Sequence, residues 1–344
     1  MRVLIDIVHP ADVLFFLNPI KRLQKLGHEI CIASRDKDVT EELLDAFQLE
    51  YRTISTAGSG LPGLAIELLK RDLALLAMVR DFQPDVMVGF GGIAISHVGK
   101  LTGKPSVSFY DTERAPLQHR ITLPFLTHMY VPDSYDGPIA KNRTTRSAWT
   151  KEFSYLHPDN FTADKTMAVA AGLVPDGRNF FVRMVGWQAN HDLGHTGWPE
   201  STLRAFINYL AAHGRVHISS ESQLPSDLEA YQYSGPIHQV HHLLAYCDCY
   251  IGESATMASE AVLLGVPALY ATNDRRGYTD YLAAKKLLWK IPSVDIGSLE
   301  KAFQLVQNLD RNDWYQRVDQ YRSSKINLAQ YVVEATLQHG ASGG

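Results

Sequence analysis

The sequence predicts an α/β protein with two doubly wound parallel-sheet domains that face a cleft. Along most of the chain, short apolar runs alternate with segments of helical periodicity, which is the pattern of parallel strands joined by helices. The alternation stops over residues 133–176, where Pro, Asn and Thr accumulate, and then restarts. A length of 344 residues also exceeds the usual size of one hydrophobic core. We therefore expect a first domain at residues 1–160 and a second at 161–344, with a last helix that can pack back on the first domain.

The first domain opens with the apolar run 3–8, which only Asp6 interrupts, as expected of a strand buried on both faces. Gly27 ends the first helix, and the Gly- and Ser-rich segment 55–63 is typical of a flexible loop that carries function. In order, the expected elements are strand 3–8, helix 13–26, strand 29–33, helix 39–47, strand 51–54, a helix that ends at Arg80, strand 85–89, helix 95–101 and strand 106–110.

The second domain repeats the alternation. Its expected elements are strand 179–185, helix 199–213, strand 215–219, helix 238–246, strand 249–251, a helix that follows Ser254, strand 268–271 and terminal helices between residues 299 and 338. Neither half contains a short-period repeat or a low-complexity tract. The chain is therefore expected to consist of two similar α/β halves.

The most informative stretch is 251–267, IGESATMASEAVLLGVP, where a strand ends at a glycine and a capped helix follows. The first backbone N–H groups of such a helix have no partners within it, and the helix dipole favours negative charge. A phosphate or diphosphate fits there. The residues expected to form this site are Gly252, Ser254, Ala255, Thr256 and Met257.

Glu260 lies about a turn and a half into the same helix, roughly 6–9 Å along its axis. A ribose lies at a comparable distance from the phosphates of a nucleotide, so this carboxylate is suited to accept both ribose hydroxyls. The same stretch also fits an ordinary strand–turn–helix with a solvated glutamate. The pattern alone does not choose between the two interpretations.

Composition narrows the class of protein. A formal net charge of −4 provides no basic field for nucleic acid. Three cysteines cannot form a disulfide framework, and the opening MRVLIDIVHP is a short strand and not a secretory signal, so we expect a cytoplasmic protein. The apolar segment 64–79 is broken by charges and cannot span a bilayer. A helix that faces the core is favoured there, although an amphipathic helix would permit peripheral membrane contact at the inner face.

Two further motifs resemble a known superfamily. The glycine motif VGFGGIAIS at 88–96, followed by Gly103-Lys104-Pro105, resembles the glycine motif and strand entry of MurG-like glycosyltransferases. The segment IGESATMASEAVLLGVPALY resembles the nucleotide-sugar motif in the C-terminal half of the same superfamily, which includes the UDP-GlcNAc 2-epimerases. The resemblance implies a GT-B fold of two Rossmann-like domains, with a nucleotide-sugar donor, commonly UDP-linked, bound by the second domain.

A still closer resemblance is to a prokaryotic GT-B-like family of unknown function. It rests on HPADVLFF at 9–16, SRDKDVT at 34–40 and RMVGWQANHD at 183–192. The similarity extends over nearly the whole chain. It is specific for the fold and for nucleotide-diphosphate sugars, and it does not identify the reaction.

The resemblance also implies roles on the acceptor side. In MurG-like enzymes a histidine at the first helix entry is proposed to act on the acceptor hydroxyl, and here that position is Asp12, with His9 three residues earlier. Either side chain would serve as general base, or Asp12 would simply cap the helix. Gly91-Gly92 would contact acceptor or pyrophosphate, or form a tight turn. Glu113 would assist acid–base chemistry, or pair with Arg114 or Arg120.

On the donor side, Arg183 ends a predicted strand and would neutralise charge on the leaving diphosphate, unless it forms a strand-end salt bridge. Trp187 and His191 lie in an unusual polar-aromatic loop that follows, and we expect both to contact the donor. We expect no metal. The D-x-D sequence at Asp36 and Asp38 is better explained by capping of the next helix. Another set, His238, His241, His242, Cys247 and Cys249, lacks the spacing of a zinc site.

The sequence thus favours a metal-independent, inverting glycosyltransferase that needs no cofactor and transfers a sugar from a nucleotide-diphosphate donor to a glycan or lipid-linked acceptor, in polysaccharide or glycoconjugate assembly. One alternative is a nucleotide-sugar 2-epimerase that uses Asp12, Glu113 and His191 for elimination and re-addition. Another is a nucleotide-sugar-binding protein without catalysis, because Asp12 replaces the expected histidine. No nucleic-acid partner is expected.

Overall fold

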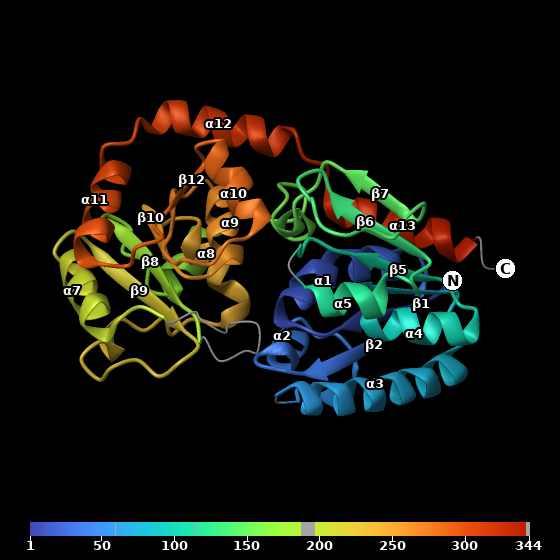
Figure 1. Cartoon of the computed structure of the whole chain (residues 1–344). Coiled ribbons are helices and arrows are strands. Elements are labelled where there is room, and N and C mark those ends of the chain that lie inside the picture. The colour runs from blue at the N-terminus through green and yellow to red at the C-terminus, as the bar shows by residue number, and fades with distance from the viewer. Residues whose placement is uncertain (59, 114, 187–196, 342–344) are drawn as a thin grey trace. The chain divides into compact units, whose positions relative to one another are not determined.

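The computed structural model describes residues 1–58, 60–113, 115–186 and 197–341 (Figure 1). The chain divides into two compact units, Met1–Phe161 with Lys325–Gly344, and Thr162–Ser324. Each unit is a parallel sheet with helices packed against it, so the predicted α/β class with two Rossmann-like domains is confirmed.

The first unit contains a seven-stranded sheet in the order β3-β2-β1-β4-β5-β6-β7. Every neighbouring pair is parallel, and Asp6 of β1 lies opposite Gly89 of β4. Strand order reverses between β1 and β4, which is where doubly wound sheets bind ligands, beyond the carboxyl ends of the strands. The elements of this unit are β1 (Arg2–Ile7), α1 (Pro10–Lys25), β2 (Glu29–Asp36), α2 (Thr40–Ala46), β3 (Arg52–Thr56), α3 (Gly60–Phe82), β4 (Val86–Phe90), α4 (Ile93–Thr102), β5 (Ser106–Phe109), α5 (Pro116–Thr122), β6 (His128–Pro132), β7 (Thr144–Ser147), η1 (Lys151–Ser154) and α13 (Leu328–Ala341).

The second unit contains a five-stranded parallel sheet in the order β12-β11-β10-β8-β9. Its strand order reverses between β8 and β10, where Arg183 and Gly252 lie opposite each other in register. The elements are α6 (Lys165–Ala170), β8 (Asn179–Met184), α7 (Glu200–Ala211), β9 (Arg215–Ser220), η2 (Glu229–Tyr231), η3 (Ile237–Gln239), α8 (Val240–Leu244), β10 (Cys249–Gly252), α9 (Ala255–Leu264), β11 (Ala268–Tyr270), α10 (Gly277–Ala284), β12 (Leu288–Lys290), α11 (Ile296–Gln307) and α12 (Arg311–Ser323).

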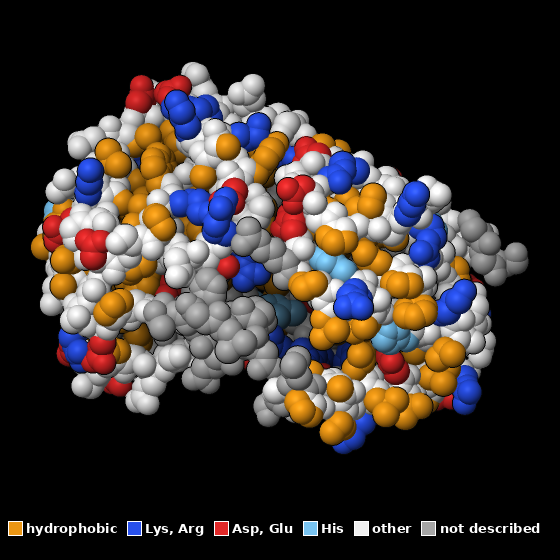
Figure 2. Space-filling view, in the orientation of Figure 1, with side chains coloured by type: hydrophobic (Ala, Val, Ile, Leu, Met, Phe, Trp, Pro, Cys, Tyr) orange, Lys and Arg blue, Asp and Glu red, His pale blue; other side chains and the backbone are white. Residues whose placement is uncertain are grey.

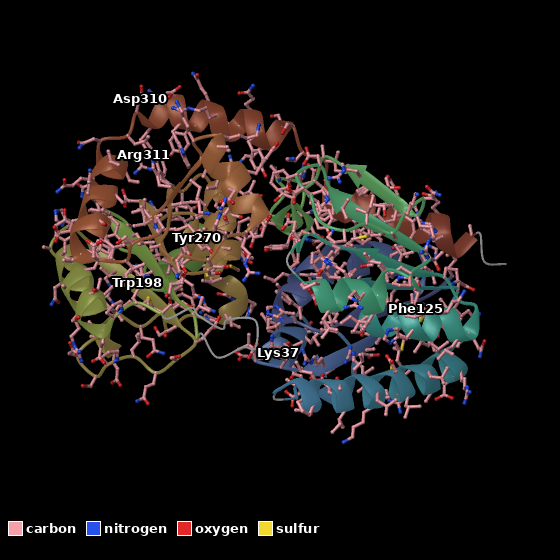
Figure 3. All side chains as sticks on the ribbon, viewed as in Figure 1. Lys37, Phe125, Trp198, Tyr270, Asp310 and Arg311 are labelled. Carbon is pink, nitrogen blue, oxygen red and sulfur yellow. The ribbon has the colours of Figure 1, made fainter. Side chains whose placement is uncertain are left out.

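A hydrophobic core of the second unit is built from aromatic and branched side chains of its strands and of the helices α7 and α11. Phe180 and Phe206 are fully buried in it, and Trp198 donates a hydrogen bond from Nε1 to the Ala271 carbonyl at 2.8 Å (Figure 3). The indole is thereby both packed and satisfied, as a buried tryptophan requires. This contact fixes the segment before α7 against the end of β11.

The last helix, α13, belongs to the first unit and packs on its sheet (Figure 1). The Tyr331 hydroxyl is 2.7 Å from Ser147 Oγ on β7, and the Tyr130 hydroxyl on β6 is 3.1 Å from His339 Nε2. Val332 and Val333 are buried. The chain therefore returns to its first unit after completing the second.

Several sequence-based expectations need correction. The segment 133–176 is not only a passage between domains, because it contains β7, η1 and α6. Strand β7 reads TTRS, without an apolar run, since it is an edge strand that is only partly buried. Segment 55–63 is not all loop, because β3 extends to Thr56 and α3 begins at Gly60. Four more elements, α5, β6, α10 and β12, carried too short a pattern to be recognised.

Helix α3 leaves an apolar stripe at the surface of the first unit. Ile66, Leu69 and Leu73 are each about 60 % exposed, with values of 58 %, 63 % and 60 %. Figure 2 shows hydrophobic side chains gathered over this helix. Its opposite face is buried at Leu75 and Val79, so the helix is held against the sheet as expected. None of the helices that the structure describes is long and apolar enough to cross a membrane.

Candidate functional site

The turn between β10 and α9 has the geometry that the sequence predicts. Ser254 is the N-cap of α9, and its side chain accepts a hydrogen bond from Met257 N–H at 3.2 Å. The helix ends at Gly265, which has the left-handed φ of 82°. Tyr250 Oη, buried in the strand, donates to the Ser254 carbonyl at 3.0 Å. The cap is thus held from the strand side, and the first N–H groups of α9 point to the carboxyl end of the sheet.

Gly252 is required at the end of β10 by a close approach to the neighbouring strand. A Cβ added there would collide with the Arg183 carbonyl oxygen and lie 2.9 Å from the Arg183 nitrogen. Both are backbone atoms of β8 and cannot rotate away. The glycine therefore sets the spacing of the two strands at the point where the sheet order reverses.

Glu260 is not a solvated helix residue. Its exposure is 3 %, and Oε1 lies 3.1 Å from Nε2 of His241 on α8, which is also buried. The two atoms are close enough to form an ion pair when His241 is protonated, but their geometry is not that of a hydrogen bond. A buried carboxylate persists when it has polar or charged partners. The Glu260 carboxylate is therefore held in place, one to two turns into α9, as a hydrogen-bond acceptor.

Arg183 is engaged with its own unit. Nη1 donates to Ser219 Oγ at 2.7 Å and Nη2 to Glu221 Oε1 at 2.5 Å, while Nε is buried without a hydrogen-bond partner among the described residues. Glu221 Oε2 also accepts the Gly186 N–H at 2.9 Å. The strand-end salt bridge that the sequence left open is thus present. Trp187 and His191, expected to contact the donor, lie outside the described residues.

Glu253 directly precedes the N-cap Ser254, and the sequence did not indicate its contacts. It is 3 % exposed, and its Oε2 accepts the Val185 N–H at 3.0 Å. Its own N–H donates to the Arg183 carbonyl at 3.0 Å. The side chain thus fixes the chain where it leaves β8, directly beside the N-terminus of α9.

In the first unit, Asp12 lies on the first turn of α1 and is 2 % exposed. Burial raises its pKa to about 6, although Lys151 at 3.6 Å and the Val8 N–H at 3.3 Å both favour the charged form. Lys151 Nζ also lies 3.7 Å from the centre of the Phe90 ring. No sequence pattern indicated Lys151, because it lies far along the chain in a segment without periodicity.

The helix α1 begins at Pro10, and His9 is its N-cap, since His9 Nδ1 accepts the Ala11 N–H at 3.2 Å. The interpretation of Asp12 as the cap is therefore wrong. His9 is exposed, unlike Asp12. Of the two base candidates, one is a surface residue bound to the backbone and the other is a buried carboxyl with a nearby lysine.

Gly91 and Gly92 both adopt left-handed φ values, 79° and 65°, in the turn after β4. A Cβ on Gly91 would lie 2.7 Å from Gln118 Nε2, and one on Gly92 would lie 3.1 Å from Ile95. The turn is thus a tight βα connection that is packed from both sides.

Glu113 lies near the phenols of Tyr110 and Tyr135. Burial is the main reason that the pKa values of both phenols are raised, and the negative charge of Glu113 adds to the effect.

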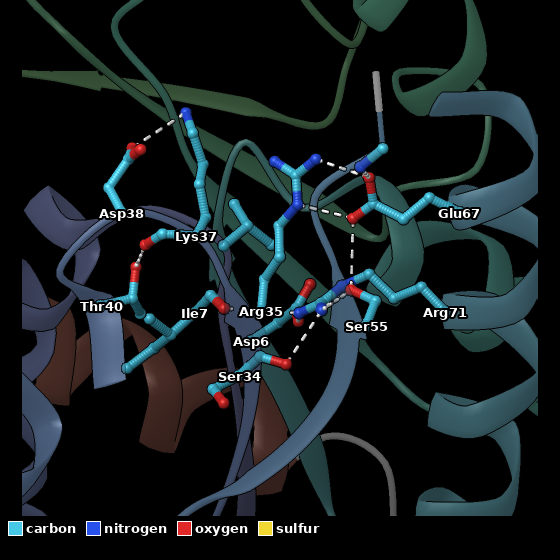
Figure 4. Close-up of polar contacts among 12 residues, drawn as sticks. Asp6, Ile7, Ser34, Arg35, Lys37, Asp38, Thr40, Ser55, Glu67 and Arg71 are labelled. Carbon is cyan, nitrogen blue, oxygen red and sulfur yellow. Dashed lines mark hydrogen bonds and ion pairs between the residues drawn. The ribbon is translucent and has the colours of Figure 1, made fainter. Parts of the chain in front are cut away.

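A buried charge network that the sequence did not indicate lies at the carboxyl ends of β1 and β2 (Figure 4). Arg71 of α3, 4 % exposed, donates to Asp6, to the Ser34 carbonyl at 3.1 Å and to Ser55 Oγ at 2.8 Å. A second pair joins Glu67 to Arg35 through two hydrogen bonds of 2.6 Å. The network ties α3 to the strand ends.

Within the described chain, no group of three or more His, Cys, Asp or Glu side chains is positioned to hold a metal ion. Asp36 is the last residue of β2, and Asp38 pairs with Lys37. The N-cap of α2 is Val39, which makes no side-chain hydrogen bond. The expectation that the D-x-D sequence caps this helix is therefore wrong. His241 and His242 contact different partners, Glu260 and the Asp164 N–H. Burial raises the pKa of Cys247 and Cys249 and keeps them as thiols.

The amino-acid sequence is similar to proteins whose function is not characterised. A family described as a protein of unknown function (DUF354) matches residues 1–154. An uncharacterised protein of Methanocaldococcus jannaschii, MJ0665, is 24 % identical over 132 residues. That alignment covers 38 % of this chain and 39 % of the relative.

Solved structures match over nearly the whole length. UDP-GlcNAc 2-epimerase from Neisseria meningitidis, bound to UDP-GlcNAc, is similar with a TM-score of 0.69, 13 % identity and coverage of 98 % of this chain and 100 % of the other. MurG from Acinetobacter baumannii is similar with a TM-score of 0.63, 13 % identity and the same coverage. At this identity the likeness shows the fold, and the chain has the GT-B fold that the resemblance implied.

Proposed function

We propose that this protein is a metal-independent glycosyltransferase that takes its sugar from a nucleotide-diphosphate donor, most naturally a UDP-sugar. The observation that carries the proposal is the pairing of an open, capped α9 N-terminus with the buried carboxylate of Glu260 on the same helix. The first offers N–H groups and a positive dipole end to a diphosphate, and the second offers an acceptor to ribose hydroxyls. The epimerase with this fold is bound to UDP-GlcNAc, which supports a nucleotide-sugar as ligand.

The donor half of the proposal involves the second unit alone. Gly252 keeps the strand end free of a side chain, Ser254 holds the helix start, and the first N–H groups, from Ala255 to Met257, would receive the diphosphate. Arg183 would stabilise the leaving group after exchanging Glu221 for phosphate oxygens, because its two Nη atoms are otherwise occupied. Trp187 and His191 are proposed to contact the donor as well. A helix dipole and a guanidinium together would replace a metal in this role.

The acceptor half involves the first unit. Asp12 is the better base candidate, because burial raises its pKa to about 6 and makes it a stronger proton acceptor than an exposed aspartate, yet it is largely ionised at pH 7. It would take the proton of an acceptor hydroxyl that attacks the anomeric carbon, with inversion. Lys151 would keep the carboxylate charged, and Glu113 and His9 would contact the acceptor, a glycan or a lipid-linked sugar.

A binding screen followed by an assay tests the proposal. Nucleoside diphosphates and nucleotide-sugars are titrated against the full chain, and the ligand that binds is then incubated with candidate acceptors. A ligand at 100 times its dissociation constant adds about 2.7 kcal/mol to the stability, which a thermal scan detects. We expect UDP or another nucleoside diphosphate to bind, and sugar transfer to vanish in Asp12→Asn while donor affinity is retained. Absence of binding by every nucleotide would refute the proposal, and binding without turnover would leave only a nucleotide-sugar-binding protein.

A nucleotide-sugar 2-epimerase is the second candidate, because UDP-GlcNAc 2-epimerases are among the solved structures that have the same fold. In that reaction Asp12, Glu113 and His191 would remove and return protons. Incubation with UDP-sugars and no acceptor, followed by NMR, separates the two reactions. A new sugar isomer would establish the epimerase, whereas a UDP-sugar that stays intact until acceptor is added would establish the transferase.

A further inference from the structure

Three buried polar atoms of the first unit belong to residues that line one small cavity, which the proposed reaction does not use. They are the Tyr110 hydroxyl, His119 Nδ1 and Thr122 Oγ1, and their residues are 4 %, 5 % and 2 % exposed. None of the three atoms has a hydrogen-bond partner within the part of the chain that the structure describes. Buried polar groups are rarely left unpaired, so three on one cavity require an explanation.

The cavity lies between β5 and α5. Tyr110 directly follows β5, while His119 and Thr122 lie on the last turn of α5, and the Tyr110 and His119 rings meet edge to face with centres 5.3 Å apart. The remaining lining residues are Gly91, Ser108, Gln118, Leu123, Leu126 and Met129. None of these carries a charge, so the lining combines polar and apolar groups and has no net charge.

The proton positions of the three groups follow from their other contacts. His119 Nε2 lies 3.1 Å from the Thr112 carbonyl, which can only accept, so Nε2 carries the proton. Burial lowers the pKa of His119, which keeps the ring neutral and leaves Nδ1 as an acceptor. The Tyr110 and Thr122 hydroxyls can each donate. The cavity therefore presents one acceptor and two hydroxyls, each able to donate or to accept, to whatever lies between them.

These hydrogen-bonding groups determine which kind of chemical group can occupy the cavity. A phosphate or carboxylate oxygen would face the lone pair of His119 Nδ1 and would lack a counter-charge, and an ammonium would also find no counter-charge among the lining residues. A neutral O–H group both donates and accepts. The cavity leaves about 10 Å³ open to the centre of a water molecule, which is about the space that one water needs.

We propose that this cavity is a binding site for one neutral hydroxyl group, held by Tyr110, His119 and Thr122 beneath the Gly91 turn. The group belongs either to a buried water or to the end of a longer polyol that enters past Gln118, whose amide contacts the position of a Gly91 Cβ. In either case it joins α5 to the chain directly after β5, because His119 and Thr122 belong to α5 and Tyr110 follows β5. The proposal is independent of the nucleotide site in the second unit.

Crystals of the full chain test the site and separate the two sources. One set is grown without any polyol, and a second is soaked in ethylene glycol. We expect an ordered peak within hydrogen-bond distance of all three atoms in the first set. An isolated peak in both sets identifies water, and density that continues past Gln118 only in the soaked set identifies a polyol hydroxyl. No peak in either set, or three side chains that bond to other groups, would overturn the proposal.

Thr122→Val removes one of the three polar atoms without changing the shape of the cavity. We expect the peak to weaken or vanish in a folded protein, and to persist in Thr336→Val, whose hydroxyl bonds to the Val332 carbonyl at 2.7 Å in α13 instead. Nitrogen NMR of the His119 ring provides a second measurement. A neutral ring protonated at Nε2 and hydrogen-bonded at Nδ1 is expected, and a ring protonated at Nδ1 would contradict the proposal.

Discussion

His241 Nε2 lies 3.1 Å from Glu260 Oε1, and both side chains are buried where α8 meets α9. A glutamate that served only as a helix residue would turn outward to water, but this one is held in place by a neighbouring ring. Because α9 also carries the capped N-terminus, the pair fixes a carboxylate at a set distance along the helix from the first N–H groups. That relationship motivates the first prediction.

If Glu260 accepts ribose hydroxyls, its loss should matter only for nucleotides that carry both of them. We expect Glu260→Gln to weaken UDP about 10- to 100-fold, as hydrogen bonds to a charged group contribute about 1.5–3 kcal/mol, and to change 2′-deoxy-UDP much less. Isothermal titration calorimetry measures both. His241→Gln should shift the UDP to deoxy-UDP ratio in the same direction, while the control His238→Gln should not. Equal losses for both nucleotides would show that Glu260 has only a structural role.

The Arg183–Glu221 pair predicts a gain of function. Phosphate oxygens have to replace Glu221 around the guanidinium, and that carboxylate competes with them. Glu221→Gln should therefore tighten nucleoside diphosphate binding a few-fold, and Arg183→Gln should weaken it. Titration at two salt concentrations checks the electrostatic origin, because screening should reduce the effect of both substitutions. Unchanged affinity in both variants would remove Arg183 from the donor site.

Gly252 should be intolerant of any side chain. Gly252→Ala pushes a methyl into the backbone of β8, so we expect a loss of about 1–3 kcal/mol in the free energy of unfolding, or more, because neither strand can relax. Gly27→Ala is the matched control, since Gly27 has a left-handed φ of 82° but nothing within 4 Å of an added Cβ. Its cost should be limited to about 1–2 kcal/mol of backbone strain. Urea denaturation measures both, and equal losses would contradict the close approach.

Asp12 predicts a pH-dependent stability. The folded pKa of Asp12 is raised to about 6 from 3.8, so the native state binds more protons than the unfolded state between these values. Stability contributed by this group therefore falls as pH rises from about 4 to about 6, by up to roughly 3 kcal/mol. Compared with the wild type, Asp12→Asn should gain in relative stability over this window. Urea denaturation of both proteins at pH 4 and pH 7 tests the sign, and a constant difference would contradict a raised pKa.

The sequence predicted the fold well where hydrophobic periodicity dictates it. Strands such as β1 and β4 are buried on both faces and therefore appear as apolar runs, and the capped helix after Gly252 is specified by local residues alone. Strand β7 could not be found in this way, because an edge strand needs no apolar run and is defined by its pairing with β6. Short elements like β12, three residues long, contain too little pattern to recognise.

The same distinction between local and long-range interactions applies to the candidate site. Ser254 and Gly265 were predictable as caps because capping is local. The partners of Asp12, Glu260 and Arg71 were not, because a pair such as Asp12 and Lys151 exists only once distant segments have packed. Charge pairing over such separations leaves no periodic signal in one sequence. The same reason hid the cavity beside Gly91, whose polar atoms come from a strand end and a helix.

A structure of the full chain with UDP, or with the nucleoside diphosphate that a binding screen selects, measures the central relationship directly. We expect the phosphate oxygens to accept hydrogen bonds from the N–H groups at the start of α9 and the ribose hydroxyls to lie within about 3 Å of the Glu260 carboxylate. Nucleotide density at any other place on the second unit, or a ribose turned away from Glu260, would contradict the proposed donor site.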